Sequence, residues 1–391
     1  MKLKFIETCK LIFTPMEKFY NSNFKLGILG GGQLGRMLIQ DAINLDVHIS
    51  ILDPSKNCPC AEIANSFTCG DFNDFQTVYD FGKTVDVLSI EIENVNTDAL
   101  LALQSEGKTI FPRPENLVII KDKGLQKQFY KDHNIATSEF TLIESKEEIQ
   151  TFPIVQKLRT GGYDGRGVQV LKSKSDLEKA FLEPSVLEDL VDIEKEISVI
   201  IARNSNGEIR TFPTVELEYN HEANLVEYLF APALISKDVE KKAKDLALQV
   251  VTAFDFIGLL AVEIFLTKTG EVLVNEVAPR THNSGHHTIE SCHTSQFEQH
   301  MRAILNMPLG DTDLLSSAVM LNLLGEPNYE GPVEYEGAEK VLKMKGAHIH
   351  LYGKAETKPF RKMGHVTVLN QDLNTAKAMA KQIKKDLKVK A

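Results

Sequence analysis

Two acidic residues could together bind a metal ion. Glu263 lies in the apolar run 259–266 and Glu276 in the run 271–277, with Gly270 in a turn-like stretch between the runs. The two positions are nearly equidistant from that turn, so we expect a β-hairpin in which Glu263 and Glu276 face each other. Oxygen ligands of this kind suit Mg²⁺ carrying substrate phosphates. The alternative is a structural ion pair, because an acid in an apolar strand needs a partner.

A glycine-rich loop upstream could contact phosphate groups. Residues 160–167 read Thr-Gly-Gly-Tyr-Asp-Gly-Arg-Gly and lie between the strand-like runs 154–158 and 168–171, unlike a Walker loop. The backbone N–H groups of such a loop can fold over a triphosphate, and Lys157 just before it supplies a positive charge. The alternative interpretation is an ordinary glycine-rich turn.

A second glycine motif, Gly30-x-Gly32-x-x-Gly35, lies between an apolar run and a helical pattern. Glycines in this position let the backbone approach a phosphate at a helix N-terminus. Together with Asp53, at the end of the next apolar run, the motif also matches a dinucleotide fingerprint. Three interpretations remain open: a general phosphate site, a nicotinamide dinucleotide site, and a tight turn that binds nothing.

Histidines and cations follow the acid pair along the chain. His282, His286 and His287 lie within six residues, but no cysteine and histidine set of zinc type completes them. A loop of Arg, Asn, Ser and His is more typical of an anion-binding surface. A second cationic group, which could also be a solvated basic face, comprises Lys354, Arg361, Lys362 and His365.

Composition limits the function classes. The chain has 391 residues, 44 Lys+Arg and 54 Asp+Glu, a net charge of −10, and 43% hydrophobic residues. Its length predicts two or three domains, and its acidic balance argues against binding to nucleic acid or to an anionic membrane. Five cysteines without a C-x-x-C pair predict a reducing, cytoplasmic environment. No apolar run approaches the ~18–20 residues of a membrane helix, and residues 1–24 lack the features of a signal peptide.

The order of the expected elements predicts an α/β chain. Strand and helix patterns alternate over residues 25–112, which indicates a small doubly wound parallel sheet. The prolines at 112 and 114 mark a boundary, after which a helical stretch runs to about residue 133. Strand-like runs then dominate, interrupted by a long helical pattern at 236–256. The later runs cover residues 154–158, 168–171, 197–202, 209–218, 259–266, 271–277, 318–324, 348–352 and 365–369.

Taken together, these motifs resemble one family. Gly30-Gly-Gly-Gln-Leu-Gly-Arg36, Gly161-Gly-Tyr-Asp-Gly-Arg-Gly167, Asn275-Glu-Val-Ala-Pro-Arg280, His282-Asn-Ser-Gly-His286 and Arg361-Lys-Met-Gly-His365 are similar to motifs of the ATP-grasp 5-(carboxyamino)imidazole ribonucleotide synthases of purine biosynthesis. The resemblance runs from about residue 25 to about residue 370.

The resemblance implies a three-part ATP-grasp fold and a homodimer. It implies an extension at 1–24, a Rossmann-like domain at 25–112, an ATP-grasp domain at 113–306 with a lid at about 123–192, and a C-terminal domain at 307–391. The implied reaction joins 5-aminoimidazole ribonucleotide to bicarbonate, with ATP split to ADP and phosphate and carboxyphosphate as the intermediate.

The resemblance also implies roles for individual residues. The implied Mg²⁺ ligands are Glu263 and Glu276. The implied ATP contacts are Lys123, Lys157, Gly162, Tyr163, Asp164, Gly165, Arg166, Gly167, Val168, Glu188, Asp189, Leu190, Val191, Glu196, His221, Asn275 and Glu276. The implied ribonucleotide contacts are Gln33, Leu34, Glu91, Asn283, Lys354, Arg361 and Lys362. The implied residues around the bicarbonate are Tyr163, Arg166 and His286, and the implied catalytic residues are these three and Lys354.

The chain departs from the family pattern in places. Lys123 stands where many relatives have arginine, which keeps the charge but loses the bidentate fork. The stretch 216–220 is slightly longer than in relatives, which affects the alignment of His221. A sister enzyme, the formate-dependent glycinamide ribonucleotide transformylase, would share the fold but not the His-Asn-Ser-Gly-His stretch. An NAD-dependent dehydrogenase would leave the loop 161–167 and the acid pair without a role. A nucleotide sensor without catalysis is a further alternative, although two metal-binding acids favour turnover.

Overall fold

The first of three main β-sheets is parallel and lies at the N-terminal end of the chain. The computed structural model describes residues 22–162, 167–220 and 225–391. The strand order is β3-β2-β1-β4-β5, and every neighbouring pair is parallel. The strands are β1 (Lys25–Leu29), β2 (His48–Asp53), β3 (Ser66–Cys69), β4 (Val87–Ile90) and β5 (Thr109–Ile110). The predicted doubly wound sheet is therefore confirmed.

Helices cover both faces of this sheet, as the nearly continuous burial of β1, β2 and β4 requires. Helix α1 (Gln33–Asn44) covers one face, whereas α2 (Phe75–Lys83) and α3 (Thr97–Ser105) cover the other. Beyond this sheet the predicted helical stretch forms two helices, α4 (Pro114–Lys121) and α5 (Lys123–Asp132). They separate at Asp122, whose carboxylate accepts the backbone N–H groups of Gly124 and Leu125 at 2.7 and 3.1 Å.

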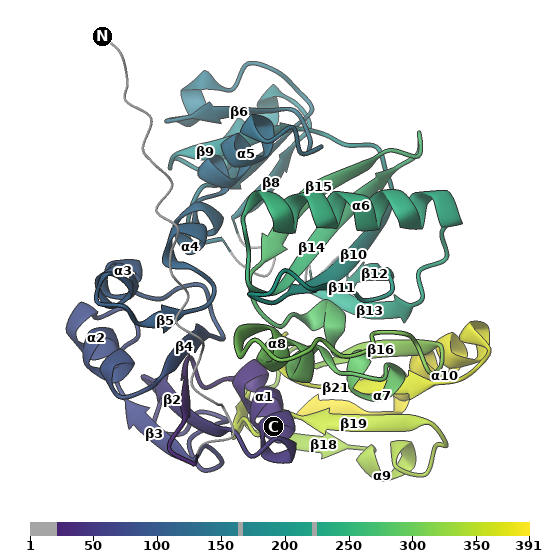
Figure 1. The fold of residues 1–391 in the computed structure, drawn as a ribbon. Helices are drawn as coiled ribbons and strands as arrows, with labels where there is room; N and C mark the ends of the chain where they lie inside the picture. The colour runs from purple at the N-terminus through teal and green to yellow at the C-terminus, as the bar shows by residue number, and fades with distance from the viewer. Residues whose placement is uncertain (1–21, 163–166, 221–224) are drawn as a thin grey trace.

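The second sheet is small and antiparallel, with the order β6-β9-β7-β8. Its strands are β6 (Phe140–Ile143), β7 (Ile154–Leu158), β8 (Val168–Leu171) and β9 (Ser185–Asp189). It lies with α5 at one end of the molecule (Figure 1). Strands β7 and β8 agree with the predicted runs 154–158 and 168–171, which flank the glycine-rich loop.

The third sheet joins the middle of the chain to its C-terminal part. It has nine strands in the order β15-β14-β10-β12-β13-β16-β21-β19, with β11 paired to β10. Its strands are β10 (Ile193–Arg203), β11 (Ile209–Thr211), β12 (Val215–Asn220), β13 (Leu225–Ala231), β14 (Gly258–Thr267), β15 (Val272–Ala278), β16 (Ala318–Leu324), β19 (Ala347–Leu351) and β21 (Lys362–Leu369). The predicted strand 209–218 is two strands, because the chain breaks at Pro213, which has no N–H to donate.

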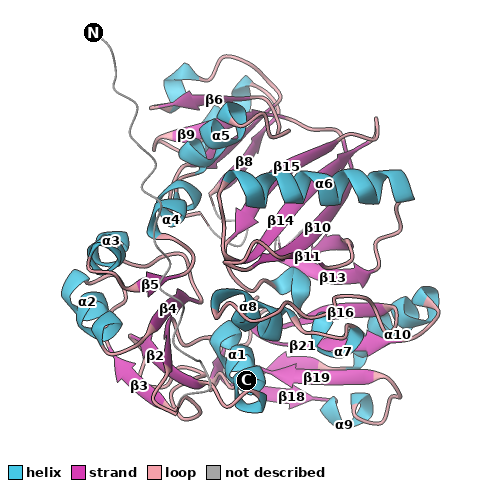
Figure 2. Ribbon diagram, viewed as in Figure 1, coloured by secondary structure: helices cyan, strands magenta, loops and turns pink. Residues whose placement is uncertain are grey.

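Several helices pack against the third sheet, and one of them, α8, also packs against the N-terminal domain (Figure 2). Helix α6 (Lys237–Ala253), close to the predicted 236–256, buries one apolar face against β10, β14 and β15. The other elements are α7 (Thr288–Ser291), α8 (Gln296–Ile304), α9 (Ala338–Val341), α10 (Leu373–Asp386), the 3₁₀ turns η1 (Lys146–Glu148), η2 (Lys174–Lys179) and η3 (Asn283–Gly285), and the short strand pairs β17 (Gly331–Pro332) with β20 (Glu356–Thr357) and β18 (Glu334–Glu336) with β22 (Lys388–Lys390).

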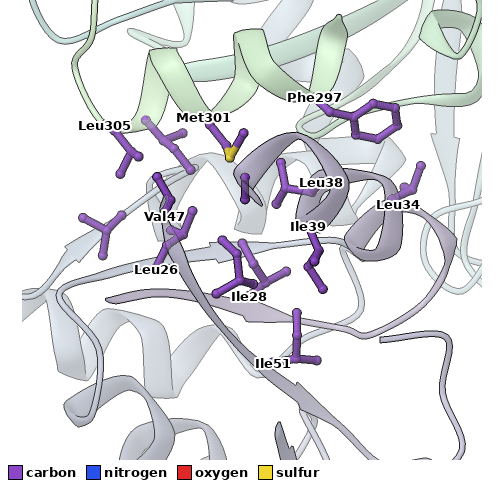
Figure 3. Close-up of a cluster of buried hydrophobic side chains, with 14 of the residues drawn as sticks. Leu26, Ile28, Leu34, Leu38, Ile39, Val47, Ile51, Phe297, Met301 and Leu305 are labelled. Atoms are coloured by element: carbon purple, nitrogen blue, oxygen red, sulfur yellow. The ribbon is translucent and has the colours of Figure 1, made fainter. Parts of the chain in front are cut away.

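Helix α8 belongs to the middle of the chain but packs against the N-terminal sheet. Phe297, Met301 and Leu305 are buried in one apolar cluster with residues of α1, such as Leu38, and of β1, such as Ile28 (Figure 3). Burial of this apolar surface fixes the N-terminal sheet relative to the rest of the molecule. Among the described residues, no helix is both long and apolar enough to cross a membrane.

Candidate active site

Glu263 and Glu276 are direct cross-strand partners on β14 and β15. This confirms the predicted hairpin and the predicted facing of the two acids. Burial and the charge of Glu276 raise the pKa of Glu263 to about 8. The nearby Lys123 ammonium lowers the pKa of Glu276 to about 2. The side chain of Glu276 is 44% exposed, so an incoming cation can reach it.

The acid pair fits a hard divalent cation. In this structure the Lys123 ammonium forms an ion pair with Glu276, so a cation already lies at one carboxylate. The pKa of Glu263 is raised first by burial and then by the charge of Glu276, so a divalent cation bound between the two carboxylates would favour the ionised form of Glu263. No group of three or more His, Cys, Asp or Glu residues is arranged for a metal ion within the described ranges. Magnesium would therefore take its other ligands from phosphates and water, as it usually does.

A buried cluster of two lysines and one glutamate lies beside the acid pair. Lys157 Nζ is 3.0 Å from Glu188 Oε1 and 2.8 Å from Asn275 Oδ1. Lys127 Nζ is 3.2 Å from Glu188 Oε2. Burial acts to raise the pKa of Glu188, but the two lysines outweigh it and the pKa is lowered. The cluster has one positive charge in excess, which favours an anion nearby.

Lys127 was not identified from the sequence. Its side chain is 3% exposed, and burial lowers its pKa to about 8. It also donates hydrogen bonds to Thr137 and Ser138 at 2.6 and 2.8 Å. The signal that could have identified it is its position four residues after Lys123, which places both lysines on one face of α5.

A cavity of about 370 Å³ lies where β9 leaves the second sheet. Its lining includes three of the residues expected at the adenine, Asp189, Leu190 and Val191, and Leu273 from the β14–β15 hairpin. Glu188, the first residue of the expected adenine segment, is 3% exposed and has its carboxylate in the lysine cluster. The apolar side chains at this cavity suit the face of a planar base.

Other residues expected to contact ATP lie around this cluster. Glu196 accepts a hydrogen bond from the Tyr219 hydroxyl, and burial raises the pKa of the Glu196 carboxyl. Gly167 has a φ of +79°, and a Cβ there would lie 3.1 Å from Cα of Gly162, so the two ends of the loop approach closely. Val168 begins β8 directly after the loop. Tyr163, Asp164, Gly165, Arg166 and His221 lie outside the described residues.

The N-terminal glycine turn binds two of the chain's own carboxylates. The N–H of Gly31 donates to Asp53 at 2.8 Å, and the N–H of Gly32 donates to Glu91 at 2.5 Å. A Cβ on Gly32 would lie 2.4 Å from Glu91 Oε1, so glycine is needed there for close approach. Asp53 is thus engaged within the turn. Burial raises the pKa of Glu91 to about 7, against the hydrogen bonds from the turn.

The expected ribonucleotide residues Gln33, Leu34 and Glu91 lie near one another in the N-terminal domain. Gln33 and Leu34 begin α1, directly after β1, and Glu91 follows the end of β4. Strands β1 and β4 are neighbours from which the strand order runs in opposite directions. This is the switch point of the sheet, where open α/β sheets bind their ligands.

One segment of the C-terminal part, next to Lys354, lies against helix α1, which begins beside this switch point. Lys354 Nζ donates to the carbonyl of Lys362 at 2.7 Å, and a Cβ on the adjacent Gly353 would lie 3.0 Å from Arg36 Nη1 in the N-terminal domain. Lys362 is close enough to Glu263 to lower its pKa. Arg361 donates to the carbonyl of Glu356 at 2.7 Å.

The stretch after Glu276 connects these parts. Arg280 forms an ion pair at 2.9 Å with Glu93, which follows β4. His282 Nε2 lies 3.7 Å from Glu263 Oε1. Neither residue was assigned a specific role from the sequence, although both lie in motifs that carried the resemblance. Their contacts place one loop between the acid pair and the switch point.

His286 and Asn283 face the C-terminal sheet. The His286 side chain is buried, at 1% exposure, and its ring centroid lies 4.8 Å from that of His365 on β21. The side-chain amides of Asn283 and Asn322 exchange two hydrogen bonds at 2.8 and 3.0 Å. His286 is thus buried against His365 of β21, whereas His282 is the histidine of this stretch that lies near Glu263.

These features define the class of the protein. Two sheets with a lysine and acid cluster between them, preceded by a doubly wound domain, are the parts of an ATP-grasp enzyme. Residues 128–297 match the ATP-grasp domain family, and residues 24–121 match the ribonucleotide synthetase preATP-grasp domain. Residues 318–379 match the phosphoribosylaminoimidazole carboxylase C-terminal domain.

The chain belongs to the N5-carboxyaminoimidazole ribonucleotide synthase family. It is 38% identical to that synthase from Bacillus subtilis, over 88% of this chain and 91% of the relative. The crystal structure of the synthetase from Thermotoga maritima is 43% identical, with a TM-score of 0.88, over 94% of this chain and 99% of that chain. The Aspergillus clavatus synthase in complex with ADP and 5-aminoimidazole ribonucleotide is 32% identical, with a TM-score of 0.85, over 93% and 99%. The chain spans about two thirds of the length of longer yeast and plant relatives named phosphoribosylaminoimidazole carboxylase.

Proposed function

We propose that the chain carboxylates 5-aminoimidazole ribonucleotide with bicarbonate, at the expense of ATP. The observation that carries this proposal is the convergence of three parts: the acid pair with its lysine cluster, the switch point with Glu91, and the C-terminal cations near Arg36. An ATP site next to a separate anion-binding site is what a two-step transfer through an activated carboxylate requires. The relative bound to ADP and 5-aminoimidazole ribonucleotide supports both ligands.

The chemistry has two steps. An oxygen of bicarbonate attacks the γ-phosphorus of ATP, so ADP leaves and carboxyphosphate forms. The amine of the ribonucleotide then takes the carboxyl group, either directly or as CO₂, and phosphate and a proton are released. Lys157 and its neighbours hold the phosphates in line, and this positioning supplies most of the rate enhancement in such transfers.

Magnesium is the cation that we propose for the acid pair. Glu263 and Glu276 would hold it, and it would neutralise charge on the transferred phosphoryl group. Lys123 lies at Glu276 and is placed to contact the phosphates once a cation binds that carboxylate. The other expected ATP contacts, including the loop residues 163–166 and His221, remain part of this proposal.

We assign the ribonucleotide to Gln33, Leu34, Glu91, Asn283, Lys354, Arg361 and Lys362. Tyr163 and Arg166 would contact the bicarbonate, and Lys354 would be a further catalytic residue. The buried His286 would help to position the residues around the bicarbonate. We further propose that the protein acts in the cytoplasm as a homodimer. An NAD-dependent reaction is disfavoured because Asp53, the acid that would bind the ribose, accepts the N–H of Gly31.

The test is the substrate dependence of ADP release. We expect rapid ADP formation only when ATP, Mg²⁺, 5-aminoimidazole ribonucleotide and bicarbonate are all present. Equal ADP formation without bicarbonate, or with formate and glycinamide ribonucleotide instead, would contradict the proposal. The ribonucleotide carboxylate product should be detected by incorporation of labelled bicarbonate.

A further inference from the structure

Gln296, the first residue of α8, is a fully buried amide with three side-chain hydrogen bonds. Its Oε1 accepts the backbone N–H of His282 at 2.9 Å, and its Nε2 donates to the backbone carbonyl of His282 at 2.8 Å. The Nε2 is also 3.0 Å from Nδ1 of His286. The side chain of Gln296 therefore binds both the N–H and the carbonyl of the His282 backbone.

The directions of these bonds fix the tautomer of His286. A backbone N–H can only donate, so the Gln296 atom that faces the His282 N–H must be the oxygen, and the other atom is the NH₂ group. The NH₂ group donates, so Nδ1 of His286 must accept and carries no proton. A neutral imidazole then carries its proton on Nε2. Burial first, and then the charges of His282 and Lys362, lower the pKa of His286 well below its ordinary value, which agrees with a neutral ring.

The residues between His282 and His286 fit this arrangement. A Cβ on Gly285 would lie 2.3 Å from Gln296 Oε1 and 2.4 Å from Ile200 Cδ1, so glycine is needed for the approach of Gln296. The hydroxyl of Ser284 is 3.0 Å from that of Ser198 on β10. Asn283 pairs with Asn322 on β16. Each residue of the stretch thus has a contact that fixes the position of His282.

We propose that Gln296 and the neutral, Nε2-protonated His286 form a positioning unit that fixes His282 beside Glu263. The imidazole of His282 lies 3.7 Å from Glu263, which is one of the two proposed Mg²⁺ ligands. In this arrangement His286 is a positioning residue, and it neither donates nor accepts a proton during turnover. The inference rests on the proposed function for its kinetic readout but not for its spectroscopic readout.

The chain offers a matched control on the same helix. Gln299 is also fully buried, and it binds one backbone residue twice: its Nε2 donates to the carbonyl of Gly310 at 3.0 Å, and its Oε1 accepts the N–H of Gly310 at 2.8 Å. Gly310 is not among the expected site residues. Gln296→Leu and Gln299→Leu therefore each remove a pair of hydrogen bonds to the backbone of one residue. Both variants should have a lower midpoint of thermal unfolding than the wild type.

Steady-state kinetics separates the two variants. We expect Gln296→Leu to lower kcat about 10–100-fold with the KM for ATP within about threefold, because misplacement of a group beside a proposed Mg²⁺ ligand reduces the rate of the chemical step. Gln299→Leu should keep kcat within about twofold of wild type, as for a change remote from the site. A wild-type kcat in Gln296→Leu, or an equal loss in Gln299→Leu, would overturn the positioning role.

Nitrogen NMR of ¹⁵N-labelled histidine tests the tautomer without turnover. The His286 signals, assigned by their absence in His286→Gln, should show a protonated Nε2 and an unprotonated Nδ1 from about pH 6 to 8. A proton on Nδ1 in the wild type would overturn the inference. If instead the wild type fails to consume the ribonucleotide while this tautomer is observed, the proposed function fails and the positioning unit stands.

Discussion

Individual side chains show how charge is distributed at the candidate site. Glu276 lies against Lys123, and Glu188 lies between Lys127 and Lys157, so each of these two acids has an ammonium partner. Glu263 is less completely compensated, and its pKa is raised to about 8. Because Glu276 is 44% exposed, removal of its charge should affect nucleotide chemistry more than folding, whereas loss of the buried Glu188 should destabilise the fold.

Glu276→Gln should abolish ATP cleavage in a folded protein. The change removes one proposed Mg²⁺ ligand and its charge while keeping the shape of the side chain. The measurement is ADP formation with all substrates present, together with a circular dichroism spectrum. Glu339→Gln, at an exposed position on α9, is the control and should retain activity. Near-normal ADP formation by folded Glu276→Gln would rule out the metal assignment.

Glu91 should make stability depend on pH. Its pKa is about 7 in the folded chain against an ordinary value of 4.5, because burial disfavours the charged form. Its contribution to stability is thus complete below about pH 4.5 and is lost as the pH rises through about 7. The measurement is the free energy of unfolding in urea for wild type and Glu91→Gln. Between about pH 5 and 8, the wild type should lose roughly 1–3 kcal/mol of stability relative to the variant. Parallel curves would show that Glu91 titrates normally.

Turns and strand pairs were the elements best predicted from the sequence. The β14–β15 hairpin was predicted with its facing acids because Gly270, with a φ of +81°, marks the turn and alternation sets the register. Strand β13 was missed, and 209–218 was predicted as one strand. Gln296 and Lys127 could not be linked to their partners, since those contacts depend on which distant elements pack together.

The glycine turn illustrates why a local motif leaves function open. Its glycines are needed for close approach, and their N–H groups donate to Asp53 and Glu91, so the acid that a dinucleotide ribose would use is already bonded within the turn. We therefore expect NAD and NADP not to bind at about millimolar concentration, an affinity that corresponds to roughly 4 kcal/mol. Isothermal titration calorimetry is the measurement, with ATP and Mg²⁺ as the positive control. Saturable NAD binding would return the dehydrogenase to consideration.

At the scale of the whole molecule, the proposed ribonucleotide site combines residues that are far apart in the sequence. Gly353, next to Lys354, lies beside Arg36, and Arg280 pairs with Glu93. The sequence indicated a C-terminal cationic group but could not show that it meets the N-terminal switch point, because no local pattern encodes how domains dock.

Arg361→Ala should raise the KM for 5-aminoimidazole ribonucleotide much more than the KM for ATP. A charge-assisted contact with a phosphate contributes roughly 1.5–3 kcal/mol, or about 10–150-fold in affinity. Steady-state kinetics with each substrate varied in turn is the measurement, and Lys358→Ala, an exposed cation nearby, is the control. Arg361→Lys should recover only part of the loss, because an ammonium lacks the planar fork. If ATP is affected most, Arg361 belongs to the other ligand.

The continuous nine-stranded sheet has a consequence for synthesis of the chain. Strand β13 ends at Ala231, but its partner β16 begins at Ala318, about 90 residues later. At about 5–20 residues per second, a ribosome needs roughly 4–18 seconds to supply that partner. During this interval the apolar strand Leu-Val-Glu-Tyr-Leu-Phe-Ala is an unpaired edge, which can pair with another nascent chain. We therefore expect slower translation through residues 232–317 to lower the yield of correctly folded protein.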